Sequence, residues 1–396
     1  MQKNSCRRAQ AACALALAAA AACASPYTPA SGAEVVELLP RRADPLQLQL
    51  RALRGELSAH PRDLALATRL AQRYIAAARG ESDPRYLGYA QAALAPWWSL
   101  PAPPPAVRLL RATVLQSLHQ FDAALRDLDA VLAAQPGNAQ AWLTRATVQT
   151  VRGDYAGATA ACARLSALAD ELVSTACLCA VAAVTGRAAK AEALLELTLR
   201  RGAGAPAEIR LWVLTQLAEM AARRGDAANA AARFELTLAL DGRDSYLLGA
   251  YADFLLEQGR GADALRLLRG QGRVDALLLR QALALRQEGA AGPALAAAAA
   301  ELGARFAAAA QRGDSVHRRE QARFELHLRR DARAALALAQ SNWAVQKEPA
   351  DMRIVLEAAL QARDAAAAAP VLRWIAEHRV EDLALARLAR QLRQLS

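Results

Sequence analysis

An alanine recurs along the chain shortly after a polar turn, and the spacing of this pattern restricts the fold more than any other feature. The turn reads GDYAGAT at 153–159, GDAANAA at 225–231 and GRGADAL at 259–265. Successive alanines are 34, 33, 39, 34, 30, 41 and 33 residues apart. A period in this range, with two apolar runs per unit, is typical of helical hairpins stacked into a solenoid. The recurring alanines are Ala124, Ala158, Ala191, Ala230, Ala264, Ala294, Ala335 and Ala368.

The composition favours helices along the whole chain. Hydrophobic residues make up 54% of the 396 residues, but aromatic residues make up only 5%, and alanine is the commonest residue. Alanine is the strongest helix former, whereas the β-branched and aromatic residues that favour strands are scarce. We therefore predict an all-α protein.

The stretch 139–170 shows how one unit is expected to pack. Small side chains at a helix crossing allow two helices to approach to about 8–9 Å. Ala146 in the first helix and Ala158 in the second are expected to make this crossing. Trp142 and Tyr155 are then expected to fill the space beside it.

These positions resemble the tetratricopeptide repeat family, although Arg145 stands where that family usually has leucine. The unit 105–137 carries the same pattern at Ala112, Phe121, Ala124 and Pro136. The resemblance covers about residues 62–378 and becomes irregular after residue 290. It implies a right-handed superhelical solenoid of antiparallel hairpins over 51–380, closed by a capping helix at 381–396.

The N-terminus has the order of an export signal, predicted over residues 1–24. Three cations precede a short apolar run that ends in small residues. Ala22-Cys23-Ala24 fits a cleavage site before Ser25. Ala20-Ala21-Ala22-Cys23 resembles instead a bacterial lipobox, which would make Cys23 a lipid-modified N-terminus and attach the protein to a membrane. Both alternatives predict a periplasmic or envelope-associated protein, with residues 25–50 as a flexible tether and leading segment.

The positive charge of the chain does not by itself indicate nucleic-acid binding. The formal net charge is +11, and it comes almost entirely from arginine, since lysine occurs only at positions 3, 190 and 347. The arginines are scattered, whereas a nucleic-acid surface usually gathers them in one stripe with aromatic residues between them. We expect no nucleic-acid partner.

The sequence contains no pattern that predicts catalysis. The histidines do not have the spacing of zinc ligands, because the pair His317 and His327 is ten residues apart and not four. No glycine-rich phosphate loop follows an expected strand. We predict that the chain is not an enzyme and holds no cofactor or metal ion.

Three cysteines lie in the expected repeats. Cys162 falls on the second helix of one unit, and Cys177 and Cys179 fall on the first helix of the next. Buried free thiols are one interpretation. In an oxidising compartment, a disulfide from Cys162 to Cys177 or Cys179 is the other.

The family resemblance also implies a binding surface. In the family, the first helix of each unit lines a concave face that holds a protein or peptide. We therefore predict a scaffold or adaptor in the bacterial cell envelope. The alternative is an accessory or regulatory subunit of a membrane enzyme, a transporter or a polysaccharide export machine. The residues expected on the concave face are Leu109, Thr113, Gln116, Gln140, Leu143, Thr147, Thr150, Trp212, Thr215, Glu219, Tyr246 and Asp253.

Overall fold

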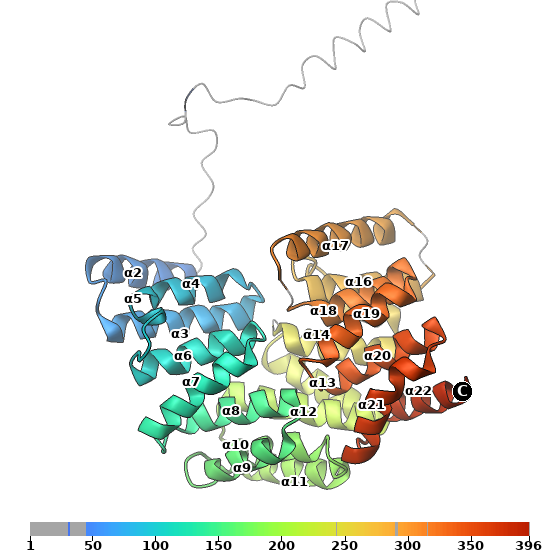
Figure 1. Ribbon diagram of the computed structural model, residues 1–396, viewed down its shortest axis with the longest axis horizontal. Coiled ribbons are helices and arrows are strands. Elements are labelled where there is room, and N and C mark those ends of the chain that lie inside the picture. Colours follow the sequence, from blue (N-terminus) through green and yellow to red (C-terminus); the bar gives the residue numbers. More distant parts are fainter. Residues whose placement is uncertain (1–30, 32–44, 243, 290–291, 315, 396) are drawn as a thin grey trace, which may run out of the picture. The chain divides into compact units, whose positions relative to one another are not determined.

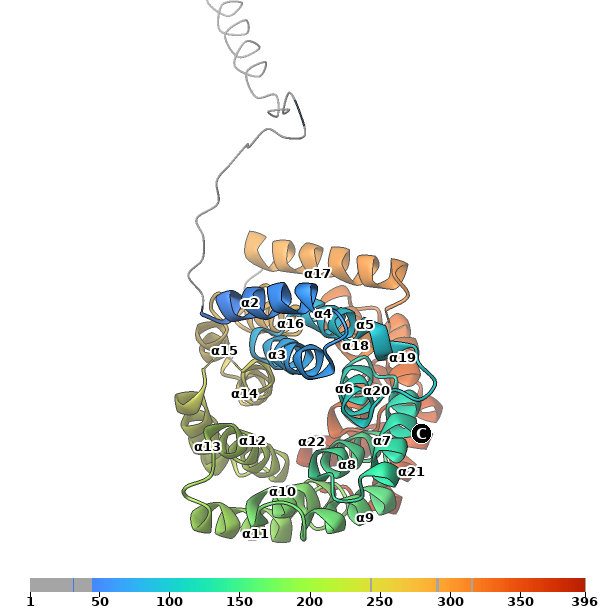
Figure 2. The same cartoon turned by 90° about the vertical axis from the view of Figure 1, so that its left-hand side faces the viewer.

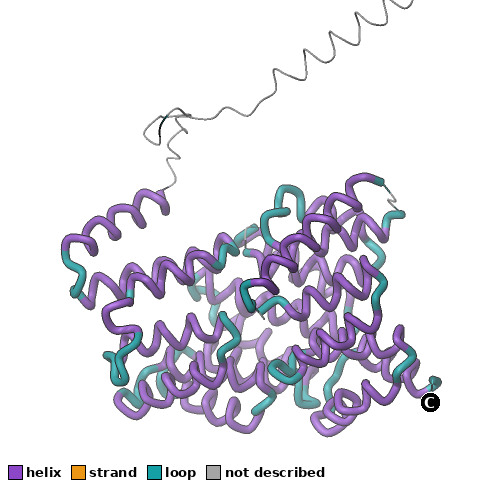
Figure 3. The backbone as a smooth tube through the Cα atoms, turned by 45° about the horizontal axis from the view of Figure 1, so that its top comes forward, coloured by secondary structure: helices purple, strands orange, loops and turns teal. Residues whose placement is uncertain are grey.

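The computed structural model consists of helices and connecting turns (Figures 1 and 3). It describes residues 31, 45–242, 244–289, 292–314 and 316–395, and these residues contain no strand. The chain divides into a unit of residues 1–51 and a unit of residues 52–396. The prediction of an all-α solenoid is confirmed.

Most of the helices pair with the next helix along the chain as antiparallel hairpins. The pairs are α3 (Leu64–Glu81) with α4 (Arg85–Ala93), α6 (Pro105–Ser117) with α7 (Phe121–Ala134), α8 (Ala139–Arg152) with α9 (Tyr155–Leu165), α10 (Glu171–Ala182) with α11 (Ala188–Arg201), α12 (Ala207–Arg224) with α13 (Ala227–Leu240), α14 (Ser245–Glu257) with α15 (Gly261–Leu267), α16 (Asp275–Gln287) with α17 (Pro293–Gln311), α18 (Arg318–Phe324) with α19 (Ala332–Trp343), and α20 (Pro349–Ala362) with α21 (Ala365–His378). The remaining elements are α2 (Pro45–Ala59), α5 (Ala95–Trp98), the π-helical turn η1 (Glu325–Arg329) and α22 (Leu383–Arg393).

The Gly-Asp pair in the recurring turn ends one helix and begins the next. Gly153 has a φ of +81° and ends α8 in the left-handed conformation that glycine adopts most easily. The carboxylate of Asp154 then accepts a hydrogen bond of 2.9 Å from the amide of Gly157 at the start of α9. Gly225 and Asp226 repeat this arrangement between α12 and α13.

The recurring alanines are buried, as expected for residues at a helix crossing, with one exception. Ala146 and Ala158 have no exposed surface, and Tyr155 packs beside them. Ala294, however, is exposed, so the predicted register is wrong at that unit. The 19-residue helix α17 instead packs through Leu302 and Phe306. Alanines so dominate this helix that the sequence pattern could not distinguish its buried face.

Segments far apart in sequence meet along a seam, in which residues 346–383 contact the turns at 119, 151–155, 186–188 and 225. Figure 2 shows α21 beside α9. The side-chain amide of Gln346 lies 2.9 Å from Nδ1 of His119, and the rings of Tyr155 and Trp374 are 6.0 Å apart. The repeats are therefore joined to distant repeats as well as to their neighbours.

The seam also supplies hydrogen-bond partners to backbone groups at the ends of helices. The amide of Lys347 donates a hydrogen bond of 2.7 Å to the carbonyl of Val151 in the last turn of α8. The carboxylate of Glu381 accepts one of 3.1 Å from the amide of Ala188, where α11 begins. Such backbone groups have no partner within their own helix, so buried contacts of this kind stabilise the seam.

The predicted termini fall partly outside the described residues. The expected signal at 1–24, with Cys23, lies outside them, as does most of the expected tether. Helix α2 begins at Pro45, within the predicted tether and leading segment. Helix α22 lies within the predicted capping segment 381–396, and Asp382 caps it by accepting a hydrogen bond of 3.0 Å from Leu385.

Candidate functional site

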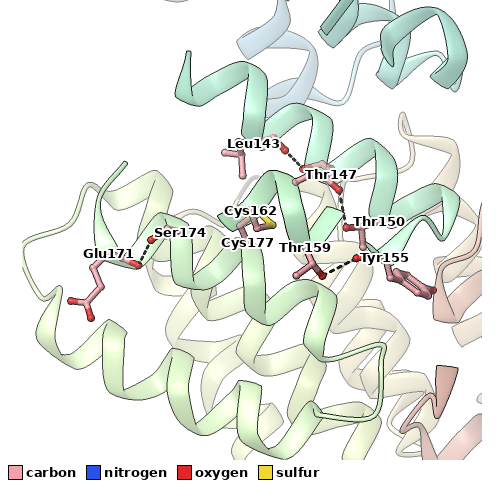
Figure 4. The surroundings of a disulfide bond; sticks show 10 residues. Leu143, Thr147, Thr150, Tyr155, Thr159, Cys162, Glu171, Ser174 and Cys177 are labelled. Carbon is pink, nitrogen blue, oxygen red and sulfur yellow. Dashed lines mark hydrogen bonds between the residues drawn. A yellow bond between two sulfur atoms is a disulfide. The ribbon is translucent and has the colours of Figure 1, made fainter. Parts of the chain in front are cut away.

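The predicted residues of α6 and α8 form a mainly polar surface. Their exposure varies: Gln140 and Thr147 are exposed, whereas the others are partly or fully buried. Thr147 donates a hydrogen bond of 3.0 Å to the carbonyl of Leu143, and Thr150 donates one of 2.8 Å to the carbonyl of Ala146 (Figure 4). These hydroxyls can still accept a hydrogen bond from a ligand. The predicted residues here are Leu109, Thr113, Gln116, Gln140, Leu143, Thr147 and Thr150.

Three of the predicted contacts need correction. Thr113 and Thr215 are only 9% and 3% exposed, and their hydroxyls bond to carbonyls one turn earlier in their own helices. They face neighbouring helices because the first helix of each unit is packed on two sides. Trp212 is partly buried against a core cluster that includes Leu217, so it supports the fold at least as much as it offers a surface.

Tyr246 is the most exposed of the large hydrophobic residues in the described part of the chain. Its side chain is 62% exposed, yet its hydroxyl donates a hydrogen bond of 2.9 Å to Glu219 on α12. The negative charge of Glu219 raises the pKa of Tyr246 well above its usual value, so the phenol remains neutral. The ring is thus held in one place while its surface stays open to solvent.

Charged side chains from distant helices act electrostatically on this pair. Tyr246 interacts electrostatically with Arg319 of α18 and with Glu348, which precedes α20. Arg319 lies 3.1 Å from the Glu348 carboxylate and 3.3 Å from that of Asp351. These groups could not be found from the repeat pattern, because Arg319 and Glu348 follow Tyr246 by 73 and 102 residues and belong to other units. We call Glu219, Tyr246, Arg319 and Glu348 the inner polar cluster.

Asp253 does not have a free carboxylate to offer to a basic ligand. The carboxylate lies 2.5 Å from Arg280 and 2.8 Å from Arg323. Burial by itself would raise the pKa of Asp253. These two guanidinium groups instead lower the pKa of Asp253 far below its usual value. The chain itself therefore supplies the basic partners of Asp253.

Glu357 on α20 is held in a similar way. It accepts hydrogen bonds of 3.1 Å from Nε2 of His327 and 2.7 Å from Nε of Arg353. Burial by itself would raise its pKa, but the hydrogen bond from His327 and the charge of Arg353 lower the pKa of Glu357 to about 2. The carboxylate is therefore charged over the whole physiological range.

This carboxylate predicts a specific acid sensitivity. Its folded pKa lies below the reference value of 4.5, so it stabilises the fold above pH 4.5, and this contribution is lost as the pH falls from 4.5 to about 2. Over that interval, we expect the wild type to lose about 1–2 kcal/mol more unfolding free energy than Glu357→Gln. Urea unfolding at several pH values measures this difference. Parallel curves for the two proteins would contradict the assignment.

The structure joins Cys162 of α9 to Cys177 of α10 in a disulfide, with the two Cα atoms 5.5 Å apart (Figure 4). Cys179 is a free, buried cysteine. Cys177 and Cys179 pack in different core clusters, which explains why only Cys177 reaches Cys162. The disulfide closes the junction between two successive units.

The described residues contain neither a candidate metal site nor a candidate membrane-spanning helix. Among them, no group of three histidine, cysteine or acidic residues is placed to hold a metal ion. In the same part of the chain, no helix has the length and apolar character needed to cross a bilayer.

Comparisons with known proteins add little to this description. No protein-family model matches the chain, and no curated protein matches it. Among solved structures, it is similar to a tetratricopeptide repeat protein from Parabacteroides merdae, with 14% identity, a TM-score of 0.37, and coverage of 73% of this chain and 98% of that one. It is also similar to the human IFIT1 dimer with m7Gppp-AAAA, with 12% identity, a TM-score of 0.41, and coverage of 88% and 86%. A third is the P58(IPK) TPR domain, with 15% identity, a TM-score of 0.22, and coverage of 89% and 98%. These values are too low to carry an argument about partners.

Proposed function

We propose that this protein is a non-enzymatic scaffold that holds a polypeptide segment of a partner at the inner polar cluster. The observation that carries the proposal is Tyr246, a large aromatic side chain that is 62% exposed and fixed by its hydrogen bond to Glu219. Aromatic residues of this kind often dominate the binding energy of protein interfaces. Because the ring is already positioned, little side-chain freedom would be lost on binding.

The surroundings of Tyr246 favour a polypeptide over a small charged molecule. Arg319 and Glu348 pair with one another, so the cluster offers both signs of charge and no strong net excess. On the first helix of another unit, α8, Gln140 and Thr147 are exposed and offer amide and hydroxyl groups to a peptide backbone. The combination provides backbone hydrogen bonding together with an apolar anchor point.

We predict that Tyr246→Ala weakens partner binding about thirtyfold or more, which corresponds to about 2 kcal/mol. Partners recovered from an extract with the wild-type protein would be purified, and their dissociation constants measured with each variant. Leu236→Ala is the matched control, because Leu236 is also 52% exposed but lies on α13, the second helix of its hairpin. Equal affinities for all three proteins would refute a binding site at Tyr246.

We also propose that the scaffold acts in the bacterial cell envelope. This proposal is supported by the export-signal pattern at 1–24 and by the disulfide between Cys162 and Cys177, since disulfides persist mainly in oxidising compartments. Mass spectrometry of the mature N-terminus would test it. Lipid-modified Cys23 would indicate a membrane-anchored protein, a free Ser25 a soluble exported one, and an intact Met1 in the cytosol would refute export.

A further inference from the structure

A cleft of about 290 Å³ lies between α9, α10 and α11, formed by residues that the proposed function does not use. Its walls are mainly apolar and include Leu178, Ala182 and Leu194. Leu194 is 51% exposed, so part of this apolar wall is open to solvent. Mainly apolar clefts with a few polar groups at their edges are a usual form of small-molecule sites.

The cleft is open because the neighbouring helices carry small side chains where they face it. Thr159 lines it from α9, and Ala182 and Ala191 line it from α10 and α11. Exposed alanines at 156, 160 and 163 continue the surface of α9. No bulky side chain of α9 lines the cleft.

Two cations stand at one end of the cleft. Arg187 and Lys190 are exposed and lie at the start of α11, one turn apart, and Leu194 follows one turn further on. Within the described residues, neither cation forms an ion pair, and Arg187 only approaches the hydroxyl of Thr185 at 3.5 Å. One acidic group is close by, since Glu381 accepts a hydrogen bond from the amide of Ala188. Two cations against one carboxylate leave an excess of positive charge at this end.

We propose that this cleft binds an unbranched aliphatic carboxylate, with its chain over Leu178, Ala182 and Leu194 and its carboxylate beside Arg187 and Lys190. The distribution of polarity supports this ligand class, because the charge is confined to one end and the remaining wall is apolar. The thiol of Cys179 also lines the cleft, and burial raises its pKa to about 11, so this part of the wall stays uncharged at neutral pH. No chemical step is involved, and the proposal is independent of binding at Tyr246.

Calorimetric titration of the full exported chain with decanoate, below its micelle concentration, tests the proposal. Saturable binding of one decanoate per chain is expected, and decanol, which has the same chain length without the charge, should bind at least tenfold more weakly. Arg187→Gln/Lys190→Gln should weaken decanoate binding about tenfold or more. Arg269→Gln/Arg273→Gln is the matched control, since both of these arginines are exposed elsewhere, and it should leave the affinity unchanged.

A second pair of variants tests the apolar wall. Leu194→Glu places a carboxylate beside the ligand chain at an exposed position, so it should abolish binding while the helical circular dichroism is retained. Leu236→Glu makes the same change at an exposed leucine of α13 and should bind decanoate like the wild type. The proposal is overturned if decanoate does not saturate, if decanol binds equally well, or if the cleft variants bind like their controls. Tighter binding of a leucine-terminated peptide than of decanoate would also overturn it, since the cleft would then be a peptide site.

Discussion

Replacing Gly153 with alanine is expected to lower the free energy of unfolding by about 2–4 kcal/mol. Two effects combine at this position. The φ of +81° costs a residue with a Cβ about 1–2 kcal/mol. The added Cβ would also overlap the ring of Trp374, which the seam places directly against Gly153, and overpacking of this kind costs about 1–3 kcal/mol. Urea unfolding followed by circular dichroism measures the loss.

Gly259→Ala separates the two effects. Gly259 has a similar φ of +72°, but a Cβ added there meets nothing within 4 Å. This control should therefore lose only the backbone contribution of about 1–2 kcal/mol. If the two variants lose the same stability, the packing of Trp374 on the turn contributes nothing, and the seam is weaker than its contacts indicate.

Replacing Asp253 with alanine is expected to cost about 2–4 kcal/mol of unfolding free energy. The substitution leaves Arg280, which is 8% exposed, without its carboxylate partner. Breaking a buried ion pair typically costs 3–5 kcal/mol. We expect somewhat less here because the Asp253 side chain is 29% exposed and that of Arg323 is 20% exposed. Chemical unfolding at neutral pH measures the effect.

Two further variants test whether this loss comes from the buried charge of Arg280. Asp129→Ala removes a carboxylate that is 58% exposed from its pair with Arg145, and it should cost less than about 1 kcal/mol. Adding Arg280→Leu to Asp253→Ala should restore part of the lost stability, because it removes the buried charge left without a partner. A double variant less stable than Asp253→Ala would show that Arg280 stabilises the fold mainly through its hydrogen bond to the carbonyl of Gly249.

The local structure of the repeats could be predicted from the sequence because it depends on neighbouring residues. Gly153 and Asp154 specify the end of one helix and the start of the next, and Ala146 and Ala158 specify the crossing. Prediction failed at Ala294, because a helix composed largely of alanine has no clear apolar stripe. It left the partner of Cys162 open for a similar reason, since two cysteines two residues apart fit the same pattern.

The candidate site was only partly predictable. Tyr246 and Glu219 could be placed from the repeat register, because both lie on first helices of neighbouring units. Arg319 and Glu348 could not, since their position beside Tyr246 depends on how the units curve. Thr215 was misassigned because the repeat register gives only the direction in which a side chain leaves its own helix. It does not show whether a neighbouring helix covers that side chain.

The seam has a consequence for the time at which the chain finishes folding. In an ordinary repeat array, each unit needs only its neighbours, so the early units can fold before the late ones are synthesised. Here, Tyr155 and the turn at Gly186 contact residues that follow them by about two hundred positions. Contacts of such large sequence separation slow folding, because a long loop must close before they form. Until the last helices have been synthesised, the early turns expose the surfaces that Trp374 and Arg379 later cover. We therefore expect this interval to be when the chain is most exposed to proteases and chaperones.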